Sequence, residues 1–214
     1  ILRLKEEPCL YFDEAQIHQV FMKKAPAFMN LLERFYATWH RNKVFTLMPH
    51  KQVFTTKGLE GDFRVMPCVI EGFEGRLIKA VKVIGTDIEQ RVVRDKVSVG
   101  KALLLHPQDN FVQAVFDVGA LTSFRTAAIS VLGYKHLARG SQKIGIIGAG
   151  RVGFYTALIL HQWLGVRELL VEDKSLEHLG NFLKGVGFIF PTLKVEGGNL
   201  NKLCENCSAL FLTT

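Results

Sequence analysis

The spacing of hydrophobic and polar residues changes period near residue 120. Before this point, apolar residues recur at helical spacing over residues 14–42 and then alternate in short runs that are typical of β-strands. Asp13 is the expected N-cap of the helix, and Pro26 is expected to kink or break it. The turn-forming residues 107–110 separate the last two runs and predict an antiparallel hairpin. The strand-like runs cover residues 43–48, 63–73, 77–85, 97–106 and 111–118.

After residue 120, helical and strand-like patterns alternate. A helix is expected over residues 121–138, with Thr122 or Ser123 as its cap and Gly140 and Ser141 at its end. Such alternation predicts an α/β fold with a parallel sheet and helices on both faces. We therefore expect two domains, residues 1–120 and residues 121–214. The other expected strands are 144–148, 168–173, 193–197 and 209–214, and the other helices are 152–165 and 178–190.

The second domain contains KIGIIGAGRVG, residues 143–153, in which the pattern GxGxxG stands between an apolar strand and a helix. Gly148 permits a tight turn, Gly150 lets the backbone approach a pyrophosphate, and Gly153 lets the helix pack closely on the strand. The free N–H groups of the helix start favour an anion. This pattern predicts a Rossmann-type dinucleotide-binding domain; the alternative is a glycine-rich turn in an α/β domain without a nucleotide. Further expected cofactor contacts are Ala149, Arg151 and Val152.

An acidic residue, Asp173, stands at the end of the next expected strand. A carboxylate there accepts hydrogen bonds from ribose hydroxyls and repels a 2′-phosphate, which favours NAD over NADP. Lys174 beside it weakens this preference. Since a complete dinucleotide-binding fold has about six strands and the pattern here ends after the fourth, we expect this domain to be incomplete and the chain to be truncated at its C-terminus.

Composition and charge exclude some classes of function but do not identify a single one. The 214 residues are 48% hydrophobic and 22% charged, with no apolar run long enough to span a membrane and no signal-peptide pattern at the start, so we expect a soluble, cytoplasmic protein. The net charge of +7 indicates either a solvated basic surface or a basic pocket for an anionic substrate. Because the basic residues are spread along the chain, nucleic-acid binding is not favoured. The four cysteines, Cys204 and Cys207 included, are expected to be ordinary thiols, and no metal site is expected.

A second motif, LTSFRTAA, leads into the cofactor strand. Its Arg125 is expected in the first turn of a helix, where a guanidinium can pair with a carboxylate through two hydrogen bonds; the alternative is a surface arginine. Together, FDVGALTSFRTAAISVLGYKHLAR and IGIIGAGRVG resemble the ornithine cyclodeaminase/μ-crystallin family. The resemblance implies an N-terminal α+β domain for substrate binding and dimerisation, an NAD cofactor, a small amino-acid substrate and a homodimer. Thr126 and the strand-end residues Thr213 and Thr214 complete the expected cofactor-binding set.

The resemblance also implies a lysine that holds the substrate carboxylate. Met66 with the proline after it resembles the start of a family strand, and both Lys79 and Lys82 follow. The distance of Lys79 from Met66 fits some members of the family, whereas the residues around Lys82 resemble one branch of it. Because side chains alternate along a strand, only one of the two lysines can face the substrate-binding cleft. We favour Lys82. Lys51 stands where many members have arginine, and Asp117, before the LT motif, is expected to be structural.

The resemblance implies three possible functions. Residues 83–86 and 130–139 resemble a branch of NAD-dependent dehydrogenases that act on an amino-acid adduct in making a siderophore precursor. In this reading, Lys82 and Arg125 orient the substrate, with Lys51 and Met66 beside them, for hydride transfer from Cα to nicotinamide and hydrolysis of the imine. The second activity is ornithine cyclodeamination, whose catalytic aspartate in the family lies beyond Thr214. The third possibility is a non-enzymatic binding protein of the μ-crystallin kind.

Overall fold

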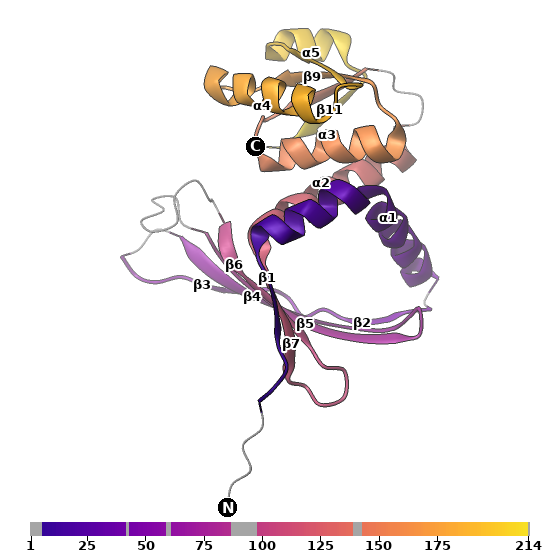
Figure 1. The fold of residues 1–214 in the computed structure, drawn as a ribbon, viewed down its shortest axis with the longest axis vertical. Coiled ribbons are helices and arrows are strands. Elements are labelled where there is room, and N and C mark those ends of the chain that lie inside the picture. Colours follow the sequence, from indigo (N-terminus) through magenta and orange to yellow (C-terminus); the bar gives the residue numbers. More distant parts are fainter. Residues whose placement is uncertain (1–5, 42, 59–60, 87–97, 139–142, 214) are drawn as a thin grey trace, which may run out of the picture. The chain divides into compact units, whose positions relative to one another are not determined.

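The computed structural model describes residues 6–41, 43–58, 61–86, 98–138 and 143–213 (Figure 1). The contacts within the chain divide it into two compact units. Unit 1 consists of Ile1–Gln19 and Leu32–Leu121, and unit 2 consists of Val20–Leu31 and Thr122–Thr214. Within the described ranges, no helix is both long enough and apolar enough to cross a membrane.

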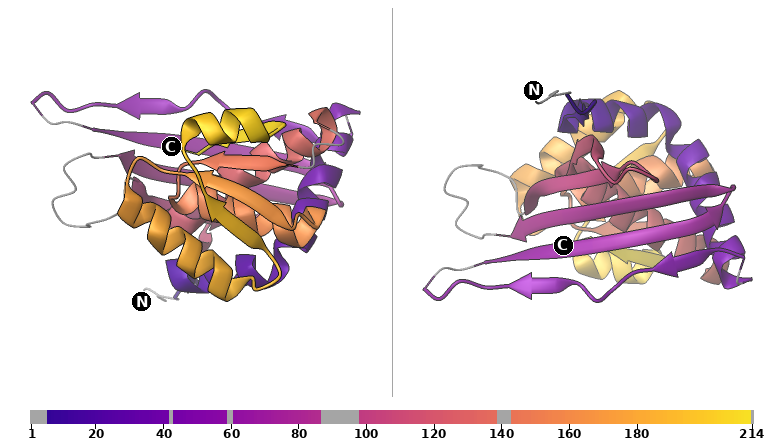
Figure 2. Two further views of the ribbon diagram at one scale, coloured as in Figure 1. Left: turned by 90° about the horizontal axis from the view of Figure 1, so that it is seen from above. Right: turned by 90° about the horizontal axis from the view of Figure 1, so that it is seen from below.

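Unit 1 contains a seven-stranded sheet in the order β1-β7-β6-β5-β4-β2, with β3 also paired to β4. The expected runs all form strands, and β6 and β7 form the expected antiparallel hairpin. The short strands β1 and β3 were not expected from the sequence. The strands lie side by side in the view from below (Figure 2). Their bounds are β1 Leu10–Phe12, β2 Phe45–Leu47, β3 Gln52–Phe54, β4 Asp62–Phe73, β5 Arg76–Thr86, β6 Ser98–Leu105 and β7 Val112–Asp117.

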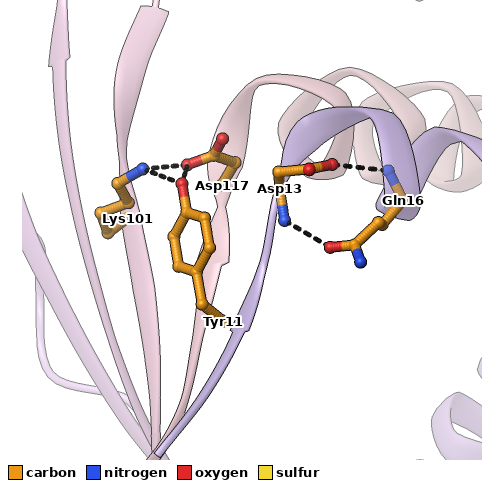
Figure 3. Close-up of polar contacts among 5 residues, drawn as sticks. All are labelled: Tyr11, Asp13, Gln16, Lys101 and Asp117. Atoms are coloured by element: carbon orange, nitrogen blue, oxygen red, sulfur yellow. Dashed lines mark hydrogen bonds and ion pairs between the residues drawn. The ribbon is translucent and has the colours of Figure 1, made fainter.

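Two helices begin where strands of this sheet end. Asp13 caps α1 (Glu14–His40) as expected, because its carboxylate accepts the N–H of Gln16 at 2.8 Å while the Gln16 side chain accepts the N–H of Asp13 at 3.0 Å (Figure 3). Pro26 lies inside α1 and does not end it. The expected cap of α2 at Thr122 or Ser123 is wrong: α2 (Val118–Leu137) starts directly after β7, so both residues lie inside the helix. The expected end at Gly140 and Ser141 lies outside the described residues.

A polar cluster joins three strands of the sheet at this end (Figure 3). The Tyr11 hydroxyl donates to Asp117 Oδ1 at 3.0 Å, and Lys101 Nζ donates to the Tyr11 oxygen at 2.8 Å and pairs with Asp117. Partial burial acts to raise the pKa of Asp117, but the bonds from Lys101 and Tyr11 outweigh it and hold the pKa below its ordinary value. The same bond to Asp117 raises the pKa of Lys101. Asp117 therefore links β1, β6 and β7, in keeping with a structural role.

Unit 2 contains a four-stranded parallel sheet in the order β10-β9-β8-β11. β8, the first of these four strands in the sequence, lies between β9 and β11, and β11 is the fourth. This is the strand order of a doubly wound dinucleotide-binding sheet. The expected α/β fold is confirmed. The bounds are β8 Ile144–Ile147, α3 Arg151–Leu164, β9 Glu168–Glu172, α4 Leu176–Ile189, β10 Lys194–Gly197, α5 Leu200–Asn206 and β11 Ala209–Leu212.

The middle of α1 belongs to unit 2, although it precedes the strands of unit 1 in the sequence. Phe21 of α1 stacks on Phe124 of α2 with 3.9 Å between ring centroids, and Phe124 is fully buried. Trp163 of α3 donates its indole N–H to Asn30 Oδ1 at 2.8 Å. The apolar face of residues 20–31 thus packs on helices that follow it by about a hundred positions, and the sequence period alone does not reveal such a partner.

Candidate functional site

The glycine-rich turn after β8 has the geometry that the sequence predicts. Gly148 has a φ of 110°, in the region that favours glycine, and its N–H donates to the carbonyl of Glu172 at 2.8 Å. Gly150 is the N-cap of α3 and supplies no side-chain bond to the first turn of the helix. The N–H groups at the start of α3 therefore keep their capacity for an anion.

The other two glycines of the motif meet opposite surroundings. A Cβ at Gly153 would lie 2.2 Å from the carbonyl oxygen of Gly148, so only glycine allows α3 to pack this closely against the turn. A Cβ at Gly150 would meet no atom within 4 Å, and Gly150 is exposed. Packing within the protein therefore requires Gly153, whereas Gly150 leaves room for a ligand.

Thr213 holds the same turn from the end of β11. Its hydroxyl lies 2.8 Å from the Gly148 carbonyl and 3.1 Å from the Ile147 carbonyl, and its N–H donates to the latter at 2.8 Å. The hydroxyl is thus a donor to the turn, a contact that the sequence did not reveal. Thr214 lies outside the described residues.

Asp173, after β9, reaches across to the glycine turn. Its carboxylate accepts the N–H of Ala149 at 2.7 Å and the N–H of Ser175 at 2.8 Å, so both oxygens already have a backbone partner. Partial burial acts to raise the pKa of Asp173, but these two bonds, with the charges of His178 and Lys174, hold the pKa below its ordinary value. The carboxylate is therefore fixed and ionised beside the turn, with lone pairs remaining for a further donor.

We expect Asp173→Asn to lower the free energy of unfolding at neutral pH by about 1 kcal/mol, because the two N–H groups bond to different carboxylate oxygens and an amide has only one accepting oxygen. The folded-state pKa of Asp173 is lowered, so its contribution is present above the unfolded pKa and is lost as pH falls through the folded value. The difference between variant and wild type should thus shrink below about pH 4. Urea unfolding at several pH values measures it, with the exposed Glu205→Gln as control. A difference that is constant down to pH 2 would contradict the prediction.

A hollow of about 340 Å³ adjoins the turn between α3 and α4. Arg151 is exposed on its rim, and Val152 lies in the same first turn of α3, half-buried. The remaining lining includes Ala149, Gly150, Phe154 and His178.

The LTSFRTAA motif lies on α2, and all of it after Leu121 belongs to unit 2. Arg125 is exposed and follows the helix start at Val118 by two turns, so the expected place in the first turn is wrong. The reason is that α2 begins directly at the strand end. Thr126 donates its hydroxyl to the Thr122 carbonyl at 2.9 Å, while the hydroxyl of Thr122 is buried and has no partner among the described residues.

Strand register brings the other expected site residues together in unit 1. Lys82 on β5 pairs directly with Met66 on β4, and paired residues share a face of the sheet. Lys51 precedes Gln52, which pairs with Val65, so Lys51 adjoins the same part of β4. These three residues are thus neighbours, and Arg125 belongs to the other unit.

Lys79 points to the opposite face of β5 by alternation. It donates to Asn110 Oδ1 at 2.8 Å, in the hairpin between β6 and β7. This placement separates the two lysines between which the sequence left a choice. Within the part of the chain that the structure covers, no three His, Cys, Asp or Glu residues gather as metal ligands.

The sequence profile of the Ornithine cyclodeaminase/mu-crystallin family matches residues 13–190. The chain belongs to this family. The match includes the strands that carry Met66 and Lys82, the motif of Arg125, the glycine turn and Asp173.

Several proteins with known names or structures resemble this chain over most of its length. It is 28% identical over 179 residues to N-((2S)-2-amino-2-carboxyethyl)-L-glutamate dehydrogenase of Staphylococcus aureus, covering 81% of this chain and 53% of that protein. The chain thus spans about half the length of this relative. Among solved structures, the Thermococcus litoralis Δ1-pyrroline-2-carboxylate reductase with NADH and L-proline has a TM-score of 0.80 at 20% identity, covering 95% of this chain and 61% of that one. An archaeal alanine dehydrogenase dimer with bound NAD has a TM-score of 0.79 at 22% identity, covering 96% and 60%.

One residue near Lys82 was missed from the sequence. Arg64 lies two positions before Met66 on β4, and alternation places both side chains on one face. The period-2 pattern of residues 63–73 carries this signal, whereas the family resemblance does not single out this position.

Proposed function

We propose that this chain carries the cofactor site and substrate-binding residues of an NAD-dependent oxidoreductase that acts on an amino acid or an amine-linked dicarboxylate. The observation that carries the proposal is the glycine turn, in which Gly153 is required by packing, Gly150 is open and Asp173 is fixed beside Ala149. It is supported by the likeness to N-((2S)-2-amino-2-carboxyethyl)-L-glutamate dehydrogenase and to folds solved with NAD or NADH.

The cofactor half of the proposed site uses backbone groups. The start of α3, with Arg151 and Val152 in its first turn, would receive the pyrophosphate, since a helix N-terminus favours an anion and Gly150 supplies no side-chain cap there. The fixed charge of Asp173 would accept the ribose hydroxyls and disfavour a 2′-phosphate, and Thr126 and Thr213 complete the proposed cofactor-binding set. NAD, when bound, supplies the acceptor for a hydride.

The substrate half uses cations. Lys82, with Lys51 and Met66 beside it, and Arg125 would hold the substrate carboxylate, so that the Cα–H bond has one orientation. Ammonium and guanidinium groups suit this role because their bonds to a carboxylate are charge-assisted. A role in making a siderophore precursor would follow if the substrate is the adduct that the Staphylococcus aureus enzyme's name describes.

The deciding assay mixes the full-length protein, NAD and either ornithine or an amino-dicarboxylate adduct, and records reduced cofactor and ammonia together. Net reduction of NAD supports the proposal. Ammonia without net reduction identifies a cyclodeaminase instead, and tight cofactor binding without either product identifies a binding protein of the μ-crystallin kind.

In the same assay, we expect Arg125→Ala to raise KM for the amino acid about 10- to 100-fold, because a charge-assisted pair is lost. The Kd for NAD should change less than twofold, as measured by fluorescence titration. Arg167→Ala is the matched control, since Arg167 is also an exposed arginine of unit 2 and uses only its backbone carbonyl in the bond from Lys194. Equal KM values for the two variants would show that Arg125 does not bind the substrate.

We further propose a homodimer formed through the sheet of unit 1. One face of this sheet carries exposed apolar residues, and two of them, Phe54 and Phe63, stack with centroids 4.8 Å apart. Such a face is typical of an interface, because exposed apolar patches of this kind are rare on monomers. The alanine dehydrogenase with the same fold is a dimer. Other exposed members of this face are Phe45, Leu47, Val83 and Val99.

A further inference from the structure

Arg64 shares a face of the unit 1 sheet with the proposed substrate residues. It pairs with Ile84 on β5 and with Val53 on β3, one alternation away from the Met66–Lys82 pair. Diagonal neighbours of this kind have Cβ atoms about 7–8 Å apart, which long side chains can bridge. Arg64 therefore lies within reach of a small molecule that Lys82 holds.

The guanidinium of Arg64 is oriented but not saturated. Its Nη2 donates to Asp62 Oδ2 at 2.7 Å, and Asp62 Oδ1 accepts the Thr86 hydroxyl at 2.9 Å. The Nε of Arg64 is buried without a partner in the part of the chain that the structure describes, and the side chain as a whole is 32% exposed. Since a guanidinium has five N–H donors, the pair with Asp62 leaves several for a second acceptor.

The surrounding charge is positive. The bond from Arg64 lowers the pKa of Asp62, burial opposes it, and the Thr86 bond and the charges of Arg64 and Lys51 add to the lowering. Lys51 thus acts on the same carboxylate as Arg64. Lys82 lies farther along the same face of β5, paired with Met66, so three cations gather along this part of the sheet, which favours an anion with more than one negative group.

We propose that Arg64 binds a second carboxylate of the substrate, distinct from the one at Lys82, and so selects amine-linked dicarboxylates over simple amino acids. This inference rests on the proposed function of the same site. Lys51 is a point charge, whereas Arg64 offers the planar fork that matches a carboxylate. Asp62 orients Arg64 and competes with the substrate for it.

The competing explanation is that Arg64 only stabilises the sheet as the partner of Asp62. The two roles predict different effects of two variants on the affinity for a dicarboxylate. If Arg64 is structural, Arg64→Gln and Asp62→Asn each break one pair and act in the same direction. If Arg64 binds substrate, Arg64→Gln removes the receptor and Asp62→Asn removes its competitor, so the effects on dicarboxylate affinity are opposite.

The test is calorimetric titration of the full-length protein, saturated with NAD, using glutarate and butyrate as unreactive probes with two carboxylates and one. Wild type should bind glutarate about 10-fold or more tightly than butyrate, from one charge-assisted bond. Arg64→Gln should lose this preference with little change for butyrate, and Asp62→Asn should increase it. Arg76→Gln, the same charge change at the far end of the β4–β5 hairpin, should keep it.

A preference that survives Arg64→Gln, equal shifts for both acids, shifts of the same sign in the two variants, or no glutarate preference in wild type would each overturn the proposal. Arg64→Lys keeps the charge without the fork and should give an intermediate preference, which provides a readout if the glutamine variant does not fold. The test of Arg64 is separate from the test of the proposed function. If the protein prefers glutarate but reduces NAD with no amino acid, the proposed oxidoreductase activity is contradicted and the proposed role of Arg64 is not.

Discussion

Gly153→Ala is expected to destabilise unit 2 by about 1–3 kcal/mol or more and to abolish measurable NAD binding. The added Cβ would lie 2.2 Å from the Gly148 carbonyl oxygen and 3.1 Å from the Thr213 hydroxyl, so α3 must move away from the turn. The alternative, a shift of the turn itself, would break the bond from Thr213 to the Gly148 carbonyl. Chemical unfolding monitored by circular dichroism and a fluorescence titration with NADH measure the two effects.

Gly150→Ala is the matched control, because it adds the same methyl group three residues earlier. At this position φ is −84° and a Cβ meets nothing within 4 Å, so stability should change by less than about 1 kcal/mol. NADH affinity should nevertheless fall about 10-fold or more, since the methyl group occupies the approach of the pyrophosphate. Equal stability losses in the two variants would show that the structural distinction between these glycines is wrong.

The second large effect is expected for Lys82→Met, which keeps the length of the side chain and removes its charge. We expect kcat/KM for the amino-acid substrate to fall about 10- to 100-fold, because a charge-assisted bond to the carboxylate is lost. The Kd for NADH should remain within twofold, since the proposed pyrophosphate and ribose contacts come from the glycine turn and Asp173 and not from Lys82. Steady-state kinetics and a separate cofactor titration give the two values.

Lys79→Met makes the same change three residues earlier on the same strand. Lys79 faces the other side of β5 and donates to Asn110, so its loss should cost some stability of the β6–β7 hairpin and leave kcat/KM within threefold. A larger kinetic effect for Lys79→Met than for Lys82→Met would make Lys79 the substrate-binding lysine. It would then be the distance from Met66, and not the residues around Lys82, that identifies this lysine in the sequence.

Much of the fold follows from signals that span only a few residues. Asp13 and Gln16 form a capping box from their own spacing, and Gly148 takes the positive φ that its turn requires. The alternation of apolar strands and helices after residue 120 is sufficient to predict a parallel sheet. By contrast, the start of α2 was misplaced, because Thr122 resembles a helix cap while the helix begins directly from β7.

By itself, the sequence determined most of the helices and strands, the steric requirement at Gly148 and Gly153, and the family of the chain. Only the tertiary structure decided that Val20–Leu31 packs in unit 2, that Thr213 and Asp173 hold the glycine turn, and that Arg64 shares a face with Lys82. The physical reason is the range of the interactions. Caps, turns and periods depend on neighbours in the chain, whereas register and close approach depend on residues that meet only when distant strands and helices pack.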